Sequence, residues 1–208
     1  MKLSKHIHSC LLIEDHEQTM LFDPGDFSYH AHALDIASLD KLDYILITHP
    51  HADHCYAPFI KDLLQKFPNA HIITNPAVKE KLDKEHISSQ TTTPETISFE
   101  PASHEKIWDS QPPQNTAITI FNKLTHPGDS LQFTRTAPIL ALPLTAPWGS
   151  TTSCIEKALA LKPKVIISIH DYLWRDEIRI AMYKRLTEFF ASKGITFKGL
   201  ETGEIITV

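Results

Sequence analysis

The chain has 208 residues, of which 42% are hydrophobic and 22% are charged, and this balance excludes a mostly disordered chain, a collagen and a coiled coil. Its formal net charge of −5 and the lack of a basic block disfavour nucleic acid as the main partner. The unusual feature is the content of 13 histidines, because neutral imidazole is the commonest metal ligand in proteins.

The first half of the chain alternates short apolar runs with turn residues. The run Tyr44–Thr48 is apolar without alternation, which is typical of a strand buried on both faces. Asn75-Pro76 places a capping side chain and a proline where a helix would begin. The elements expected here are a hairpin of strands (Leu11–Ile13 and Thr19–Phe22) that ends at Asp23-Pro24-Gly25-Asp26, a strand (Tyr44–Thr48), a helix (Pro58–Lys66), a strand (His71–Thr74) and a helix from Asn75 through Leu82.

The second half predicts more strands before two longer helices. Val165–Ile169 is a second continuous apolar strand, and it runs directly into His170. Because strands come in runs with helices interspersed, we expect one α/β domain over residues 1–208, with two helix-covered sheets rather than a doubly wound parallel sheet. The elements expected here are strands over Thr96–Glu100, Ala117–Phe121, Leu131–Phe133, Ile139–Leu142, Val165–Ile169, Ile195–Phe197 and Glu204–Val208, and helices over Ser150–Leu161 and Glu177–Ser192.

The strongest motif is the segment Thr48-His49-Pro50-His51-Ala52-Asp53-His54. It places four potential metal ligands within six residues at the end of a buried strand. Alternate side chains of extended backbone point the same way, so His49 and His51 can converge on one ion. Asp53 and His54 follow where the chain turns towards a helix and can face a second ion. A polar loop with chance histidines is the simpler alternative, but H-x-H-x-D-H after such a strand is a demanding pattern.

This motif resembles the first metal-binding motif of the metallo-β-lactamase fold superfamily. Other segments resemble that superfamily in the same order along nearly the whole chain. Within the superfamily, the chain most resembles small, single-domain metal-dependent hydrolases related to ascorbate-6-phosphate lactonase. The segment Leu142–Trp148 also resembles that group. The matching segments are Leu21–Gly25, Glu100–His104, His126-Pro127-Gly128-Asp129-Ser130 and Ile169-His170-Asp171.

The resemblance implies a four-layer αββα sandwich with two divalent ions at one edge. It implies that His49, His51 and His104 hold one ion, that Asp53, His54 and His170 hold the other, and that Asp129 bridges them. Asp53 and Asp129 are the expected catalytic carboxylates. The expected chemistry is hydrolysis by a metal-bridging hydroxide, since two ions lower the pKa of a shared water and polarise the scissile bond. Zinc is the expected metal, although this ligand set also accommodates manganese, iron, nickel or cobalt.

We expect a small, anionic substrate such as an ester, a lactone or a phosphoester, because two divalent ions outweigh the two carboxylates. A cytoplasmic location is expected, since there is no signal peptide or membrane span, and three well-separated cysteines do not suggest disulfides. All three cysteines, Cys10, Cys55 and Cys154, are expected to be buried and inert, with most doubt about Cys55.

Two other functions stay open. One is a non-haem iron oxidoreductase, which is disfavoured because diiron relatives typically carry Glu at the position of His51. The other is a non-catalytic binding protein that is stabilised by its metals.

Several further residues are open between a structural and a functional role. His8 is expected to be structural, and His6, His16, His71 and His86 are expected at the surface. We expect Asp23 to orient a metal-bound histidine or its loop, His126 to support a ligand, and Trp148 to form a pocket wall. His30 and His32 are either solvent-exposed or in contact with substrate, while Tyr172 is a weak candidate for contact with a reaction oxyanion.

Overall fold

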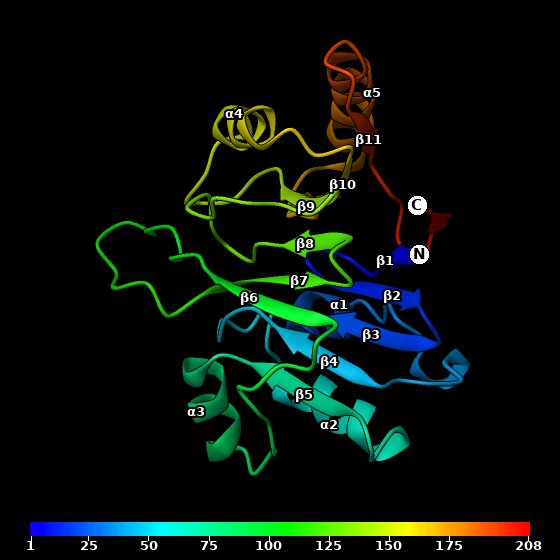
Figure 1. Ribbon diagram of the computed structural model, residues 1–208, viewed down its shortest axis with the longest axis vertical. Helices are drawn as coiled ribbons and strands as arrows, with labels where there is room; N and C mark the ends of the chain where they lie inside the picture. The colour runs from blue at the N-terminus through cyan, green and yellow to red at the C-terminus, as the bar shows by residue number, and fades with distance from the viewer. The chain divides into compact units, whose positions relative to one another are not determined.

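The computed structural model describes all 208 residues and consists of two compact units. Unit 1 comprises Met1–Thr93, Pro113–Asn115 and Glu201–Val208, and unit 2 comprises Pro94–Pro112 and Thr116–Leu200. Each unit contains one six-stranded mixed sheet (Figure 1). The expectation of a single domain over residues 1–208 stays a prediction.

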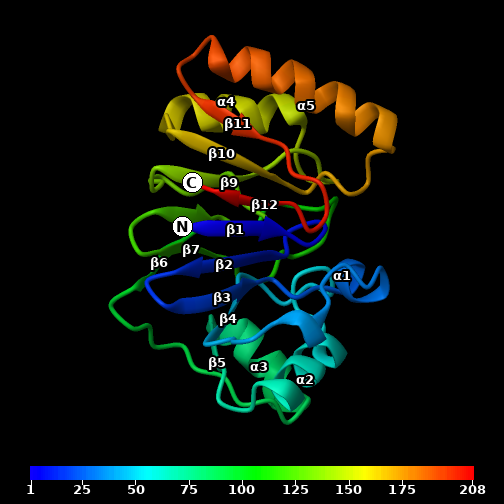
Figure 2. The ribbon, with the colours of Figure 1, turned by 90° about the vertical axis from the view of Figure 1, so that its right-hand side faces the viewer.

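The sheet of unit 1 has the strand order β12-β1-β2-β3-β4-β5. β1 pairs antiparallel with β12 and β2, and β2 pairs antiparallel with β3, whereas β3, β4 and β5 run parallel. The two chain ends meet in this unit, since the Met1 amino group donates to the Val208 carbonyl at 3.1 Å (Figure 2). The strands are β1 (Lys2–Lys5), β2 (Leu11–Asp15), β3 (Gln18–Phe22), β4 (Tyr44–Ile47), β5 (His71–Thr74) and β12 (Ile205–Thr207).

The helices of unit 1 cover this sheet through an apolar core. They are α1 (Asp26–His30), the 3₁₀ turn η1 (Ile36–Ser38), α2 (Ala57–Lys66) and α3 (Pro76–Lys84). Figure 1 shows α2 and α3 beside β4 and β5. Fully buried side chains such as Ile60 and Leu63 on α2 pack with Ile45 of β4, and each such side chain contributes about 1.5–3 kcal/mol of transfer free energy.

The sheet of unit 2 has the order β11-β10-β9-β8-β7-β6. β6, β7 and β8 pair antiparallel, and β8, β9, β10 and β11 pair parallel. The strands are β6 (Ile97–Pro101), β7 (Thr116–Ile120), β8 (Leu124–His126), β9 (Ile139–Pro143), β10 (Val165–Ile169) and β11 (Thr196–Lys198).

Two helices, α4 (Thr151–Leu161) and α5 (Asp176–Ala191), pack on the β9–β11 half of this sheet (Figures 1 and 2). Ala158 of α4 and Phe190 of α5 are fully buried in one cluster with Leu140 and Ile166 of the strands. No helix in either unit combines the length and the hydropathy that a membrane crossing requires.

The α/β class with two helix-covered sheets is confirmed, and one predicted strand is wrong. Leu131–Phe133 lies outside the sheet, because two of its amides donate to side chains instead of a neighbouring strand: Leu131 N to Glu105 Oε1 and Gln132 N to Ser130 Oγ, each at 2.9 Å. The sequence prediction missed four elements, which are β1, α1, η1 and β8. They have only three to five residues each, too few for a periodicity to show.

Candidate metal centre

The H-x-H-x-D-H segment of unit 1 begins where a parallel pair of strands ends. β3 ends at Phe22 and β4 at Ile47, so the residues that follow them share one edge of the sheet. Asp23 joins the two strand ends, since its Oδ1 accepts a hydrogen bond from Thr48 N at 2.8 Å. Gly25 then passes so close that a Cβ there would lie 1.8 Å from the carbonyl oxygen of Asp53. The metal-binding motif therefore rests against the backbone of the turn after β3.

Three ligand atoms of this segment form a compact cluster. One atom each from His49, Asp53 and His54 lies within 4.8 Å of the other two. The His49 ring centroid is 4.0 Å from that of His54 and 4.9 Å from that of His51. His49 and His54 are fully buried, whereas the side chain of Asp53 is 29% exposed. The strand end thus gathers two buried imidazoles and a carboxylate that solvent can reach.

Hydrogen bonds define which ring nitrogen of each buried imidazole carries the proton. Asp23 Oδ2 lies 2.7 Å from His54 Nδ1 and also accepts from Thr48 Oγ1 at 2.8 Å. An ionised carboxylate only accepts, so His54 Nδ1 donates and the lone pair lies on Nε2. Thr48 Oγ1 has given its hydrogen to Asp23, so at 3.1 Å it accepts from His49 Nδ1. A carboxylate on one ring nitrogen is the usual support for a histidine that binds metal through the other.

Unit 2 gathers a second group of expected ligands at the carboxyl ends of its strands. His104 follows β6, Asp129 follows β8 and His170 follows β10 directly. Asp129 Oδ1 is 2.8 Å from His170 Nε2, and Asp129 Oδ2 is 3.5 Å from His104 Nε2. Each of the three residues is 3% exposed. One buried carboxylate therefore faces two buried imidazoles.

Trp148 is part of this second group and holds its carboxylate. The indole Nε1 donates to Asp129 Oδ2 at 2.7 Å, and the Trp148 ring centroid lies 5.7 Å from the His170 ring. The sequence suggested that Trp148 forms a pocket wall, and the structure adds this hydrogen bond. His104 is held in a similar way, because its Nδ1 donates to the Glu105 carbonyl at 2.6 Å and leaves the lone pair on Nε2.

Both groups fit a divalent ion by the chemistry of their donors. Imidazole nitrogen with carboxylate oxygen suits zinc, manganese, iron and nickel. Buried carboxylates and imidazoles are costly without strong partners, and a cation is such a partner. The structure brings together His49, Asp53 and His54 in unit 1, with His51 beside them, and His104, Asp129 and His170 in unit 2.

The other singled-out histidines have different surroundings. His126 is fully buried, and its Nδ1 accepts from Gly128 N at 3.2 Å, which shapes the turn before Asp129. His30 is exposed and packs on Tyr29 and Tyr56. The prediction that His6 lies at the surface is wrong: it is buried at the β1–β2 turn, with Nδ1 2.8 Å from the Ala33 carbonyl and Nε2 2.9 Å from Ser4 Oγ.

The three cysteines are free and buried, as expected. Burial raises the pKa of Cys55 to about 12, although Lys81 lowers it in part, and burial likewise raises the pKa of Cys10 and Cys154 to about 12. A thiol with such a pKa is protonated at neutral pH and is a poor nucleophile. Cys55 therefore serves packing beside the histidine cluster.

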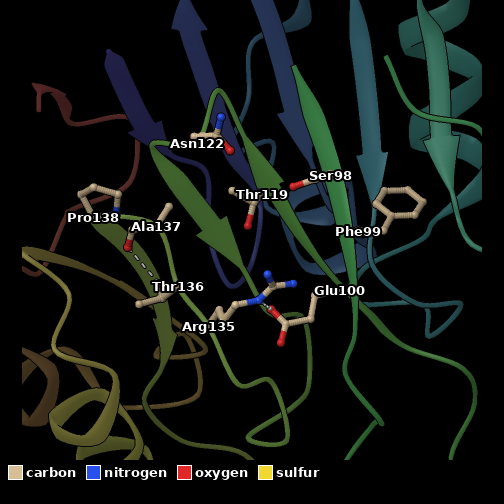
Figure 3. A pocket seen from close by; sticks show the side chains of 9 residues that line it. All are labelled: Ser98, Phe99, Glu100, Thr119, Asn122, Arg135, Thr136, Ala137 and Pro138. Carbon is tan, nitrogen blue, oxygen red and sulfur yellow. Dashed lines mark hydrogen bonds and ion pairs between the residues drawn. The ribbon is translucent and has the colours of Figure 1, made fainter. Parts of the chain in front are cut away.

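A separate pocket of about 420 Å³ lies on unit 2, between β6, β7 and the segment 135–138 (Figure 3). Its lining is mostly polar and includes Glu100 and Arg135, whose side chains face each other with Nε 3.8 Å from Oε2. Glu100 Oε1 also accepts from Thr134 N and Oγ1 at 2.9 and 2.6 Å. This carboxylate is thus engaged in holding the segment after Phe133 against β6.

The chain also matches a known family. The family model described as the Beta-lactamase superfamily domain matches residues 2–170. The chain belongs to this superfamily. Among its relatives is Protein Rv0786c of Mycobacterium tuberculosis, which is 30% identical over 200 residues, covering 90% of this chain and 92% of that protein.

Solved structures of this superfamily's fold match nearly the whole chain. Igni18, a metallo hydrolase from the archaeon Ignicoccus hospitalis, is 17% identical, with a TM-score of 0.69 over 99% of this chain and 97% of that chain. CmlA, a diiron β-hydroxylase from Streptomyces venezuelae, is 14% identical, with a TM-score of 0.69 over 100% of this chain and 54% of that chain. These likenesses confirm the metallo-β-lactamase fold.

Proposed function

We propose that this β-lactamase superfamily protein is a metal-dependent hydrolase that acts on a small, anionic substrate. The observation that carries the proposal is the cluster of His49, Asp53 and His54, whose ligand atoms lie within 4.8 Å of one another at the end of a buried strand. The hydrogen bond from His54 to the buried Asp23 supports the metal-binding role of His54, because a histidine that binds metal usually donates its other ring N–H to a carboxylate.

The proposed centre uses the seven ligands that the sequence motifs supply. His49, His51 and His104 would hold one divalent ion, and Asp53, His54 and His170 would hold a second. Asp129 would bridge the two ions. The match of one family model to residues 2–170, a range that contains all seven residues, supports this ligand set. When bound, the ions would lower the pKa of a water molecule and polarise the scissile bond of the substrate.

The protein's own residues have three roles in this proposal. We propose that Asp53 takes a proton from the attacking water and passes it to the leaving group, and its greater exposure than that of Asp129 supports this choice. Asp129 contributes negative charge at a buried position, held by Trp148. Asp23 and Thr48 keep the imidazoles of His54 and His49 in the tautomers that present Nε2.

The charge balance favours an anionic substrate. Two divalent ions carry +4, Asp53 and Asp129 carry −2, and the histidine ligands are neutral, so the proposed site would be net positive. An ester, a lactone or a phosphoester with a negative group meets this requirement. Zinc is the metal we propose first, with manganese, iron or nickel as alternatives of the same ligand chemistry. We also propose a reducing, cytoplasmic location, which the three free cysteines support.

The decisive experiment combines metal analysis with a substrate panel. The purified protein is assayed for bound metals, then tested on generic ester, lactone and phosphodiester substrates before and after chelation and after re-addition of Zn²⁺ or Mn²⁺. We expect hydrolysis that chelation abolishes and the metal restores. Hydrolysis that survives complete metal removal would contradict the proposal.

The same experiment separates the two rival functions. Stoichiometric iron with oxygen consumption and no hydrolysis would identify an oxidoreductase instead. A binding protein that keeps its metals only for stability would show no turnover on any substrate, and Asp129→Ala would leave its partner binding intact. The proposed hydrolase loses turnover in Asp129→Ala while the variant stays folded by circular dichroism.

A further inference from the structure

His8 lies in the turn between β1 and β2, where the backbone adopts an unusual conformation. Ile7 and His8 both have left-handed dihedral angles, with φ of +67° and +56°. This region favours glycine and asparagine, and a β-branched residue such as Ile7 is rarely found there. Such residues are strained, and strain of this kind persists where the surrounding structure holds it and often where function requires it.

Contacts from α1 and the turn itself hold this conformation. His6 N donates to the Cys10 carbonyl at 2.7 Å, and Cys10 N donates to the Ile7 carbonyl at 3.0 Å. The buried Ser28 of α1 donates its hydroxyl to the carbonyl of His6, with a longer contact of 3.3 Å to that of Ile7. The backbone therefore fixes the direction of the His8 side chain.

The His8 ring lies on the metal-binding segment. Its Nε2 is 3.1 Å from Asp53 Oδ2, and the residue is 3% exposed. The ring also packs edge-on against His54 and Phe27, with centroid distances of 5.4 and 5.1 Å. A carboxylate accepts and does not donate, so His8 Nε2 carries the hydrogen. The same oxygen, Asp53 Oδ2, also lies 3.8 Å from His54 Nε2.

We propose that His8 is a positioning residue of the metal centre that acts through Asp53. The inference rests on the proposed function and adds a residue to it. The side chain of Asp53 is 29% exposed, and the hydrogen bond from His8 holds it in the rotamer that places Oδ2 3.8 Å from His54 Nε2, within the cluster of His49, Asp53 and His54. Removal of a residue that hydrogen-bonds to a metal ligand typically lowers metal affinity about 10–100-fold.

The alternative is that His8 only fills space in the turn, and two substitutions separate these roles. Asparagine is favoured in the left-handed region, so His8→Asn suits the backbone, but its amide nitrogen reaches only as far as the position of Nδ1. The amide nitrogen of glutamine reaches the position of Nε2, so His8→Gln retains the donor and lacks the backbone advantage. A structural role predicts that Asn is the better replacement, and a positioning role predicts that Gln is.

The test measures metal affinity and stability of the full chain. Wild type, His8→Asn and His8→Gln are first stripped of metal. One sample of each is unfolded with urea to measure its stability. A second, folded sample is titrated with Zn²⁺ and with Mn²⁺ against a chromophoric chelator to measure metal affinity. We expect metal-free His8→Asn to be at least as stable as the metal-free wild type. We expect it to bind one of the two ions about 10–100-fold more weakly than wild type does. We expect His8→Gln to bind both ions with nearly wild-type affinity. In an Asp53→Ala background, replacement of His8 should have no further effect on affinity.

Three results would overturn the assignment in distinguishable ways. If wild type binds two ions and His8→Asn binds them equally well, the role of His8 is refuted while the proposed function stands. If His8→Gln binds as weakly as His8→Asn, the donor at Nε2 is not what matters, and the positioning role fails. If wild type itself binds no divalent ion, the proposed function fails and the role of His8 fails with it.

Discussion

At the scale of single residues, the candidate centre depends on side chains that fix other side chains. Asp23 is fully buried, has a left-handed φ of +42°, and accepts hydrogen bonds from Thr48 and His54. Trp148 plays the corresponding part in unit 2 by donating to Asp129. These hydrogen bonds restrict the orientations that the ligand side chains can take. Such preorganisation is what a tight metal site needs.

Asp23→Asn tests the orientation of His54. The amide places an N–H donor where the carboxylate accepts, so His54 Nδ1 would lose its acceptor and the Nε2 tautomer would no longer be selected. We expect metal affinity to fall about 10–100-fold. We also expect the free energy of unfolding to fall by about 1–3 kcal/mol, because buried polar groups lose partners. The matched control is Asp62→Asn, an exposed carboxylate that accepts from Tyr29, and equal behaviour of the two variants would contradict the assigned role.

Trp148→Phe tests the support of Asp129. The phenyl ring keeps an aromatic group near His170 and removes only the N–H donor to Asp129 Oδ2. We expect metal affinity to fall by about tenfold or more, measured by competition with a chromophoric chelator. Trp108→Phe is the control, since Trp108 is 85% exposed. The role of Trp148 is wrong if both variants bind the ions as wild type does.

At the scale of elements, the expected ligands all follow the ends of strands. In unit 1, parallel strands β3 and β4 end beside each other and place Asp23 next to the motif. In unit 2, β8, β9 and β10 are parallel, so Asp129, Trp148 and His170 follow strand ends on the same edge. Loops at the carboxyl ends of parallel strands are common sites of binding, because the sheet positions them firmly.

Gly25→Ala tests how closely the turn after β3 supports the metal-binding motif. The added Cβ would lie 1.8 Å from the carbonyl oxygen and 2.9 Å from the Cα of Asp53, so backbone must move. We expect the free energy of unfolding to fall by about 1–3 kcal/mol in urea titrations. Gly149→Ala is the control, since its Cβ would meet only Cys154 Sγ at 3.8 Å. That control should change stability by less than about 0.5 kcal/mol, and an equal loss in both variants would contradict this account.

The lowered pKa of Glu100, on strand β6, predicts that this residue contributes to stability in a pH-dependent way. Burial alone would raise its pKa, but the hydrogen bonds from Thr134 and the charge of Arg135 outweigh burial and lower the pKa. A carboxyl group with a lowered pKa stabilises the fold above its unfolded pKa, and this contribution is lost as pH falls through the folded pKa.

The pH dependence is tested with Glu100→Gln. We expect the variant to be less stable than wild type by about 1 kcal/mol at pH 7. The difference should begin to fade below the ordinary pKa of a glutamate side chain, and it should be lost as pH falls through the lowered pKa of folded Glu100. Glu188→Gln, at an exposed position of α5, should show no such trend. A difference at Glu100 that is independent of pH would show that its charge is not involved.

At the scale of the whole molecule, the sequence predicted what depends on pattern and missed what depends on packing. The H-x-H-x-D-H motif and the strands that precede it and His170 were predicted, since buried strands and dense ligand spacing leave a clear pattern. The three-residue β8 and the five-residue α1 are too short for a periodicity to show. The apolar residues of Leu131–Phe133 suggested a buried strand, and Phe133 is fully buried, but outside the sheet. The contact of His8 with Asp53 spans 45 residues and has no signal in spacing.

The most direct test of the central claim asks whether the seven proposed ligands serve one pair of ions. The metal-free protein is loaded with Mn²⁺ and examined by electron paramagnetic resonance, with Asp129→Ala as the comparison. We predict two ions per chain in wild type with the spectrum of a spin-coupled pair, and loss of that coupling in Asp129→Ala. A wild-type spectrum of isolated, uncoupled Mn²⁺, or protein that binds no Mn²⁺ or Zn²⁺, would contradict the account.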